Sequence, residues 1–414
     1  MADTRFGPQL MRRFSQFARH SDEPEQLTRV YLSPAHKRAC EELEGWLQQA
    51  GMTTRCDALA TLIGRYEGTE LAAPALLIGS HIDTVRNAGK FDGTLGVLAA
   101  LAAVEELHRL NERFAFAIEI VAFGDEEGVR FPITLSGSRA LAGTLGRHAF
   151  NVKDAAGISL GDALREFGCD PEQLLEARRS PVDTVAFIEA HIEQGPVLEQ
   201  NDQPLGVVTA ISAAKRFSVT VTGSSGHAGT VPMDMRSDSL AASAEMVLEI
   251  EALAKRADQV VATVGFIEAK PGSVNVIPGT TSFTIDLRSA TNSECKEQAD
   301  RIEEKLTEIA RRRGVSVSVQ PTHAMEAVEC ALNVRNELSR AIETLGYQPI
   351  ALPSGAGHDA MAMATLCDTG MLFVRCKGGL SHHPGESIAE ADADACVRAL
   401  LAFIRSFEPA RTDI

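Results

Sequence analysis

The sequence predicts an α/β protein in which one domain is interrupted by a smaller, inserted α+β domain. Three observations predict this. Apolar segments typical of strands buried on both faces alternate with helical segments over residues 74–127. Near residue 212 the pattern changes to strands of period two, and buried-strand segments return after residue 326. We therefore expect residues 1–211 and 326–414 to form the first domain, and residues 212–325 the second.

The first domain begins with helical periodicity over residues 26–50. The next segments read in turn as a buried strand, an amphipathic helix and a second buried strand: PALLIGSHID, GTLGVLAALAAVEELHRL and FAFAIEIVAFGDEE. Two later segments, PIALPSGAGHDAM and GMLFVRC, show the same apolar pattern typical of buried strands. Strands that are apolar on both faces need helices on both sides, which predicts a covered sheet.

The second domain begins with FSVTVTG, whose apolar residues alternate with period two. A helix from Asp238 to Ala257 follows, then the strands VVATVGFIEA and TSFTIDLRS, the helix ECKEQADRIEEKLTEIARRR and the strand VSVSVQP. The order β-α-β-β-α-β is typical of ferredoxin-like domains.

Charge and composition exclude several kinds of partner. With 40 Lys+Arg against 56 Asp+Glu in 414 residues, the net charge is −16, which argues against nucleic acid or an anionic membrane. No apolar run approaches the roughly 20 residues of a membrane helix, and the N-terminus lacks an apolar signal core. The 8 scattered cysteines include no CxxC pair, so we expect reduced thiols in a cytoplasmic protein.

Polar residues gather where the predicted strands end, which is where open α/β sheets bind ligands. His81 ends one strand, and Asp83 points to the same side, so its carboxylate could accept the other ring proton of a metal-binding histidine. Asp92 follows in a glycine-flanked turn before a helix. The alternative is structural, with His81 capping the strand and Asp92 capping the helix.

A second group of acids, Asp125, Glu126 and Glu127, directly follows the next buried strand. Such crowding is unfavourable unless a cation or a shared proton relieves it. One carboxylate on a metal with its neighbour as general base would explain the crowding. A solvated acidic loop is the alternative.

Two further strand ends supply histidines. AFIEAHIEQG contains His191, and GGLSHHPGES contains His382 and His383, of which at most one should face a site because adjacent side chains diverge. A lone histidine is more often structural, but four such loops together indicate a di-metal centre. Imidazole and carboxylate ligands without cysteine suit Zn²⁺, Mn²⁺, Co²⁺ or Ni²⁺.

Together the motifs resemble the metal-dependent allantoate amidohydrolase and N-carbamoyl-L-amino-acid hydrolase family, which includes β-ureidopropionases and is related to aminoacylase and carboxypeptidase-like di-zinc enzymes. The matching stretches include GSHIDTV, FDGTLGV, GDEEGVRF, GSRALAGTL, HIEQGPVLE, GHAGTVPM, NVIPG, DLR and SGAGHDA. The resemblance runs from LTRVYLSPAH to SHHPGE. It implies a mixed-sheet, di-zinc peptidase-like catalytic domain with an inserted ferredoxin-like domain that acts as lid and dimerisation element of a homodimer.

The resemblance also implies the roles of the strand-end residues. Glu126 would be the general base for a water activated by two metals. The implied ligands are Asp92 as the bridge, Glu127 and His382 on one metal, and His81 and His191 on the other. The wider superfamily commonly has an acidic ligand where this chain has His191, which favours the branch that hydrolyses carbamoyl groups.

Further residues would contact the substrate. By resemblance, Arg288 binds its carboxylate, His227 stabilises the oxyanion, and Asn275 donates a hydrogen bond. Gln194 and His358 would support the ligands or contact the ureido group. Taken without the resemblance, Arg288 could be a strand-end arginine paired with an acid, His227 a loop histidine and Asn275 a turn residue.

The expected reaction releases ammonia and CO₂ from a small anionic ureido compound, either an N-carbamoyl-L-amino acid or allantoate. Lys215 and Arg216 in AISAAKRFSV favour allantoate, unless they are ordinary exposed strand charges; FPITLSGSRALAGTL favours N-carbamoyl amino acids, towards which we lean. An aminoacylase or dipeptidase, and a non-catalytic binding protein, are the alternative classes.

Overall fold

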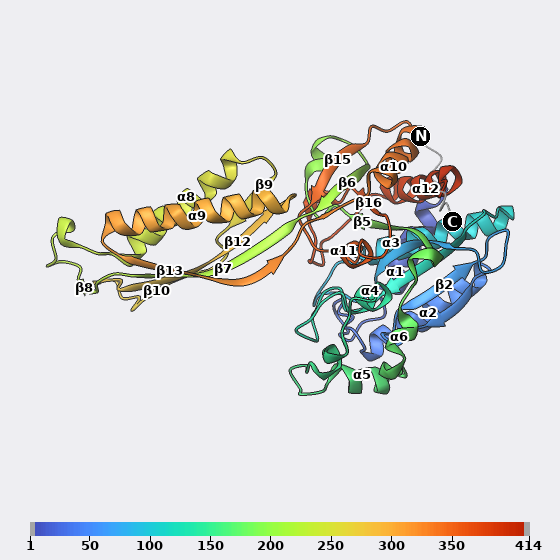
Figure 1. Cartoon of the computed structure of the whole chain (residues 1–414), viewed down its shortest axis with the longest axis horizontal. Helices are drawn as coiled ribbons and strands as arrows, with labels where there is room; N and C mark the ends of the chain where they lie inside the picture. Colours follow the sequence, from blue (N-terminus) through green and yellow to red (C-terminus); the bar gives the residue numbers. More distant parts are fainter. Residues whose placement is uncertain (1–4, 410–414) are drawn as a thin grey trace. The chain divides into compact units, whose positions relative to one another are not determined.

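The computed structural model describes residues 5–409 and divides into two compact units. Unit 1 runs to Thr209 and takes in Cys330–Leu352 and the chain from His358 onward, and unit 2 comprises Ala210–Glu329 and Pro353–Gly357. Figure 1 shows the elements of each unit. Within the described residues, no helix combines the length and apolarity needed to cross a bilayer.

The larger sheet has nine strands. In order across the sheet, they are β1 (Thr53–Cys56), β2 (Leu62–Tyr66), β4 (Ala117–Phe123), β3 (Ala75–His81), β5 (Thr184–Ile192), β16 (Thr369–Val374), β6 (Leu205–Ile211) and β14 (Val328–Glu329), with β15 (Ile350–Ser354) pairing with β6. The four central strands β4, β3, β5 and β16 are parallel, and the flanking pairs are antiparallel. This confirms the predicted α/β class with a mixed sheet, and it brings the carboxyl ends of four strands to one edge.

Helices cover this sheet and form one large apolar core with it. The longer ones are α1 (Gly7–Phe17), α2 (Pro34–Gln49), α3 (Thr94–Leu110), α10 (Leu332–Thr344) and α12 (Glu390–Ser406). The short helices of unit 1 are α4 (Ser136–Leu141), α5 (Leu160–Phe167), α6 (Leu174–Ala177), α7 (Val197–Gln200) and α11 (Ala360–Met363). Single 3₁₀ turns occur at Arg147–Asn151, Pro171–Gln173, Pro181–Asp183, Lys377–Gly379 and, in unit 2, Met233–Met235.

The helix predicted over residues 26–50 begins only at Pro34. Ser33 ends the preceding extended segment and caps α2, because its side chain accepts a hydrogen bond from the amide of His36. The residues before it run alongside another loop, with the amide of Ala88 donating to the carbonyl of Leu27. Long-range pairing therefore overrides the local helical pattern there.

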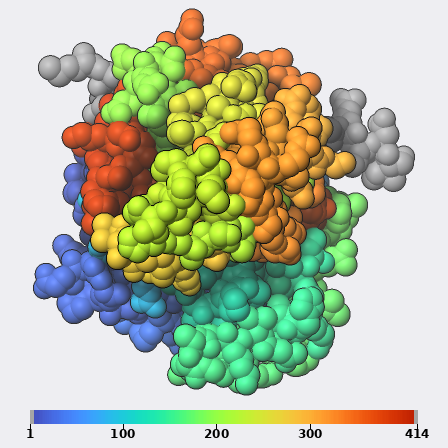
Figure 2. Space-filling model, turned by 90° about the vertical axis from the view of Figure 1, so that its left-hand side faces the viewer, coloured from blue at the N-terminus to red at the C-terminus, as the bar shows by residue number. Residues whose placement is uncertain are grey.

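Unit 2 contains β7 (Ala213–Thr222), α8 (Ser239–Arg256), β9 (Val260–Thr263), β10 (Ile267–Lys270), β12 (Thr280–Ser289), α9 (Asn292–Arg313) and β13 (Ser316–Met325). The sheet order is β10-β12-β7-β13, with β9 also on β12, and all pairs are antiparallel. β7 and β13 pair with each other although they are far apart in sequence. In the space-filling view, yellow-green and orange segments of this unit lie side by side (Figure 2). Buried residues of the sheet and of both helices form a separate core.

The single strand predicted over 260–269 is wrong, because the chain breaks there into two strands. β9 pairs with the end of β12, opposite Asp286–Ser289, and β10 pairs with its beginning, opposite Thr280–Phe283. A short ladder of β8 (Gly226–His227) and β11 (Val276–Ile277) completes the unit.

Candidate metal centre

The four polar segments singled out in the sequence meet at the carboxyl ends of the four parallel strands. His81 is the last residue of β3, the acidic loop follows β4, His191 is the penultimate residue of β5, and His382 follows β16. Asp92 lies just before α3. All of these residues belong to unit 1.

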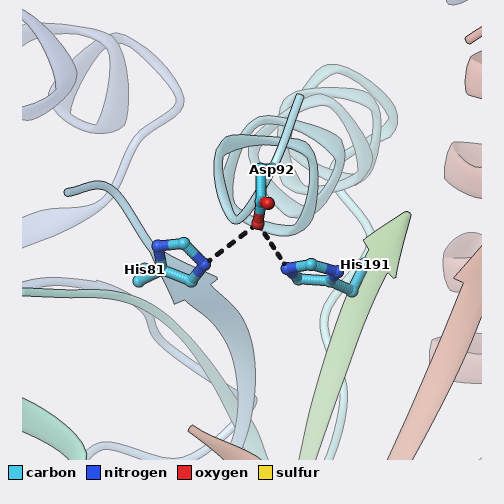
Figure 3. A group of neighbouring side chains, drawn as sticks. All are labelled: His81, Asp92 and His191. Atoms are coloured by element: carbon cyan, nitrogen blue, oxygen red, sulfur yellow. Dashed lines mark ion pairs between the residues drawn. The ribbon is translucent and has the colours of Figure 1, made fainter. Parts of the chain in front are cut away.

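Asp92 is buried at the centre of the group. Its Oδ1 lies 3.4 Å from Nε2 of His81 and 3.0 Å from Nε2 of His191, as drawn in Figure 3. Its Oδ2 lies 3.3 Å from Nε2 of His382. The helix that follows has Gly93, at φ 62°, as its N-cap, and no side chain caps it. The helix-cap alternative for Asp92 therefore does not hold.

Three overlapping sets of side chains place one donor atom each within 4.8 Å of one another. The sets are His81 with Asp92 and His191, Asp92 with Glu127 and His382, and His81 with Glu126 and Glu127. The first two sets share Asp92, with His81 and His191 next to its Oδ1 and His382 next to its Oδ2. Nitrogen and oxygen donors in this arrangement fit two divalent cations of the zinc or manganese type.

The two buried histidines are held in one orientation by the main chain. The Nδ1–H of His81 donates to the carbonyl of Asp83 at 3.0 Å, and that of His191 donates to the carbonyl of Ile192 at 2.9 Å. With the proton on Nδ1, the Nε2 lone pair of each ring points into the group. The predicted partner of His81 was the Asp83 carboxylate, but that group lies 3.8 Å from Nδ1 and the carbonyl takes its place.

The Asp83 carboxylate instead holds the acidic loop. It accepts hydrogen bonds from the amides of Glu126, at 3.2 Å, and Glu127, at 3.3 Å. Asp125 is fully buried with φ 66°, and its carboxylate accepts from the Ser136 hydroxyl. The segment is thus an ordered turn in a strained conformation rather than a solvated loop.

Burial and crowding shift the ionisation of the group. Burial would raise the pKa of Asp92, but the three histidines hold it well below its usual range. Burial raises the pKa of Glu126 well above normal and that of Glu127 to about 7. The Asp92 contact raises the pKa of His382 to about 8. Such opposed shifts are typical of functional sites.

Three residues that are not ligand candidates support Asp92. Gln194, at φ 57°, donates to its Oδ2 at 3.0 Å, and the Ser381 hydroxyl donates to the same oxygen at 2.8 Å. Glu386, which the sequence analysis missed, accepts from the amides of Phe91 at 2.9 Å and Asp92 at 3.1 Å. The only sequence signal for Glu386 is its place in the SHHPGES motif.

The remaining histidines near the centre differ in their surroundings. The His358 ring is buried and packs edge-on against His191 at 4.5 Å, and burial holds its pKa well below normal. It therefore packs behind a ligand candidate. His383 is exposed, and its Nδ1 accepts the amide of Gly385 at 3.0 Å, so His382 is the histidine of this pair that faces Asp92.

The other predicted substrate residues belong to unit 2. The β8–β11 ladder brings His227 opposite Val276, next to Asn275, and both predicted side chains are exposed. Arg288 forms a salt bridge to Asp286 at 2.8 Å.

Lys215 does not share the face of Arg288. It pairs with Leu287, which is buried in the core of unit 2, whereas Asp286 pairs with Arg216. Because side chains alternate along a strand, Arg216 lies on the Arg288 face and Lys215 on the opposite one. Lys215 and Arg288 therefore stand on opposite faces of the unit 2 sheet.

Comparison with known proteins agrees with these features. Residues 77–406 match the model of Peptidase family M20/M25/M40. The chain is 39% identical to the allantoate deiminase of Arabidopsis thaliana, over 95% of this chain and 81% of the relative. It is also 39% identical to the N-carbamoyl-L-amino acid amidohydrolase of Geobacillus stearothermophilus, over 93% of this chain and 95% of the relative.

Solved structures are similar over the full length. A hydantoinase/carbamoylase-family amidase from Burkholderia multivorans has a TM-score of 0.91 at 29% identity and covers 98% of both chains. Aminopeptidase PepT from Bacillus cereus, at 17% identity and a TM-score of 0.65, shares the fold. The chain is a hydrolase that belongs to Peptidase family M20/M25/M40, and it resembles the amidohydrolases of that family over most of its length.

Proposed function

We propose that this protein hydrolyses the ureido C–N bond of a small anionic substrate, either an N-carbamoyl-L-amino acid or allantoate, and releases ammonia and CO₂. The observation that carries the proposal is Asp92, whose two oxygens face two different sets of ligand side chains. The named activities of relatives at 39% identity support the choice of bond.

The ligand sets would hold two divalent cations. When bound, the cations would lower the pKa of a water molecule that they share. Glu126 is a carboxylate close to the ligand candidates His81 and Glu127. Its amide donates to Asp83, which holds it in place. It would take the proton of the water, whose oxygen attacks the ureido carbon. It would then pass the proton to the leaving nitrogen as the C–N bond breaks.

Unit 2 supplies the proposed recognition residues. Arg288 would bind the substrate carboxylate, since a guanidinium offers a bidentate fork, while His227 and Asn275 would donate to the carbonyl. The strand order of unit 2, with both helices packed against one sheet, supports a ferredoxin-like topology. We propose that this unit serves as lid and dimerisation domain. We include a homodimer in the proposal because the edge segment of β9 and β10 exposes Val261, Phe266 and Ile267. Light scattering on the purified protein would test that assembly.

The activity is tested with purified protein loaded with Mn²⁺ or Zn²⁺. Ammonia release is measured from allantoate and from a panel of N-carbamoyl-L-amino acids, with N-acetyl amino acids and dipeptides in parallel. We expect turnover of ureido substrates and its loss after chelation. Turnover of N-acetyl amino acids or dipeptides alone would instead identify an aminoacylase or dipeptidase.

A further inference from the structure

A single arginine in the N-terminal segment of unit 1 is completely buried. Arg29 has 0% exposure and lies in the irregular segment before α2. Burial lowers the pKa of Arg29 to about 10, so the guanidinium is still charged at neutral pH. A buried charge is unfavourable unless its hydrogen bonds are satisfied, so its partners indicate why it is kept.

Those partners are oxygens from three separate segments. Nε donates to the carbonyl of Ile82 at 2.6 Å, and one terminal nitrogen donates to the carbonyls of Phe17 and His20 at 3.1 and 3.2 Å. The other terminal nitrogen donates to the hydroxyl of Thr94 at 3.3 Å. Among residues 5–409, the guanidinium forms its hydrogen bonds with carbonyl and hydroxyl oxygens alone.

Two of these partners lie in the segments that carry ligand candidates. Ile82 lies between His81 and Asp83, and Thr94 is the first residue of α3, two positions after Asp92. The guanidinium therefore spans the gap between the end of β3 and the start of α3.

The main chain around Arg29 adds to this connection. The Arg29 amide donates to the hydroxyl of Thr84 at 2.9 Å, and the Thr84 amide donates to the Arg29 carbonyl at 3.0 Å. The amide of Ala88 donates to the carbonyl of Leu27 at 2.8 Å. The arginine segment thus runs along the loop that leads from His81 to Asp92.

We propose that Arg29 is a positioning residue of the metal centre, which sets the spacing between His81 and Asp92 by binding both of their segments. It contacts neither ligand side chain and acts through Ile82 and Thr94. The inference rests on the proposed function only in taking His81 and Asp92 as metal ligands. A residue with a general packing role would stabilise the fold without affecting metal affinity.

The test is metal binding by Arg29→Lys, measured by competition with a chromophoric chelator for Zn²⁺ or Mn²⁺. Lysine keeps the charge, but its single ammonium cannot reproduce the planar fork that reaches both segments. We expect the folded variant to bind metal about 10- to 100-fold more weakly, as is usual when support of a ligand is lost. Thr94→Val removes one acceptor, leaves Arg29 in place, and should weaken binding in the same direction but less.

Arg65→Lys is the matched control. Arg65 is also mostly buried and donates to the Ala73 carbonyl and to Glu67 and Glu119, and it contacts neither ligand segment. Wild-type metal affinity in both Arg29→Lys and Thr94→Val, with thermal destabilisation equal to that of Arg65→Lys, would overturn the inference. A wild-type protein that binds no divalent cation would overturn the proposed function as well, so the two failures are distinguishable.

Discussion

The carboxylate of Asp83 accepts the main-chain amide of Glu126 at 3.2 Å, and thereby connects the end of β3 to the proposed general base. The same carboxylate accepts the amide of Glu127 at 3.3 Å. One side chain therefore orients both a proposed base and a proposed ligand, although it lies near neither of them in the sequence.

Asp83→Asn should lower kcat about 10- to 100-fold while KM changes little, because one amide of the acidic loop then faces an NH₂ group instead of a carboxylate oxygen. Steady-state kinetics with saturating metal measures this effect. A wild-type kcat in the folded variant would show that the loop keeps its conformation without this carboxylate.

Glu126→Gln should retain two metals per chain and lose about 10²–10⁴-fold in kcat, because the amide cannot accept the proton. Metal content by mass spectrometry and turnover of the best ureido substrate check the two halves of the prediction. Glu193→Gln is the control: Glu193 is also buried, but it accepts the amides of Val197 and Leu198. Activity of Glu126→Gln equal to that of the control would contradict the base assignment.

Glu386→Ala should weaken metal binding about tenfold or more, because the amides of Phe91 and Asp92 lose their acceptor. Glu386→Gln keeps an oxygen at that position and should remain within a few-fold of wild type. Calorimetric titration with Mn²⁺ compares the pair. Equal affinities for the alanine and glutamine variants would exclude the positioning role.

Metal affinity should fall as the pH falls. In the metal-free protein the pKa of His382 is raised to about 8 by Asp92, and that of Glu127 is raised to about 7 by burial. Below each value the ligand carries a proton that must leave before metal binds, so apparent affinity should drop up to about tenfold per pH unit and proton. Competition titrations between about pH 6 and pH 9 measure the slope. A flat profile would contradict the assignment of both ligands.

His36 should make the fold sensitive to acid. Burial, assisted by the charge of Arg29, lowers the pKa of His36 to about 3, against about 6.5 in an unfolded chain. Between these two pKa values the unfolded state binds a proton on His36 that the folded state does not bind. The contribution of the neutral, buried His36 to stability is therefore complete above about pH 6.5. It is lost as the pH falls towards 3, by up to about 1.4 kcal/mol per pH unit. Urea unfolding of His36→Asn, whose side-chain oxygen can still accept the amide of Leu32, should show a shallower pH dependence than wild type. Identical slopes would exclude His36 as a cause.

The sequence predicted the strand ends well because each is marked locally. β3, β4 and β16 are buried at every position and mostly apolar, and polar residues occur at or shortly after the end of each. The residues that hold Asp92 in place have no such local signal in the sequence. Glu386 and Phe91 are 295 positions apart, and the donor of their hydrogen bond is a backbone amide, which almost any residue could supply. Lys215 and Arg216 are neighbours, so only the register against β12 decides which one shares the face of Arg288.

The position of β16 has a consequence for biosynthesis. This strand lies between β5 and β6 in the sheet, yet it is made about 160 residues after β6, with most of unit 2 in between. Until it emerges from the ribosome, the pairing edge of β5 has no partner on that side, while the contiguous part of unit 2 is already complete. Nascent chains that stop before Thr369 should therefore expose an apolar strand edge and aggregate or recruit chaperones, whereas chains that include β16 can close the sheet.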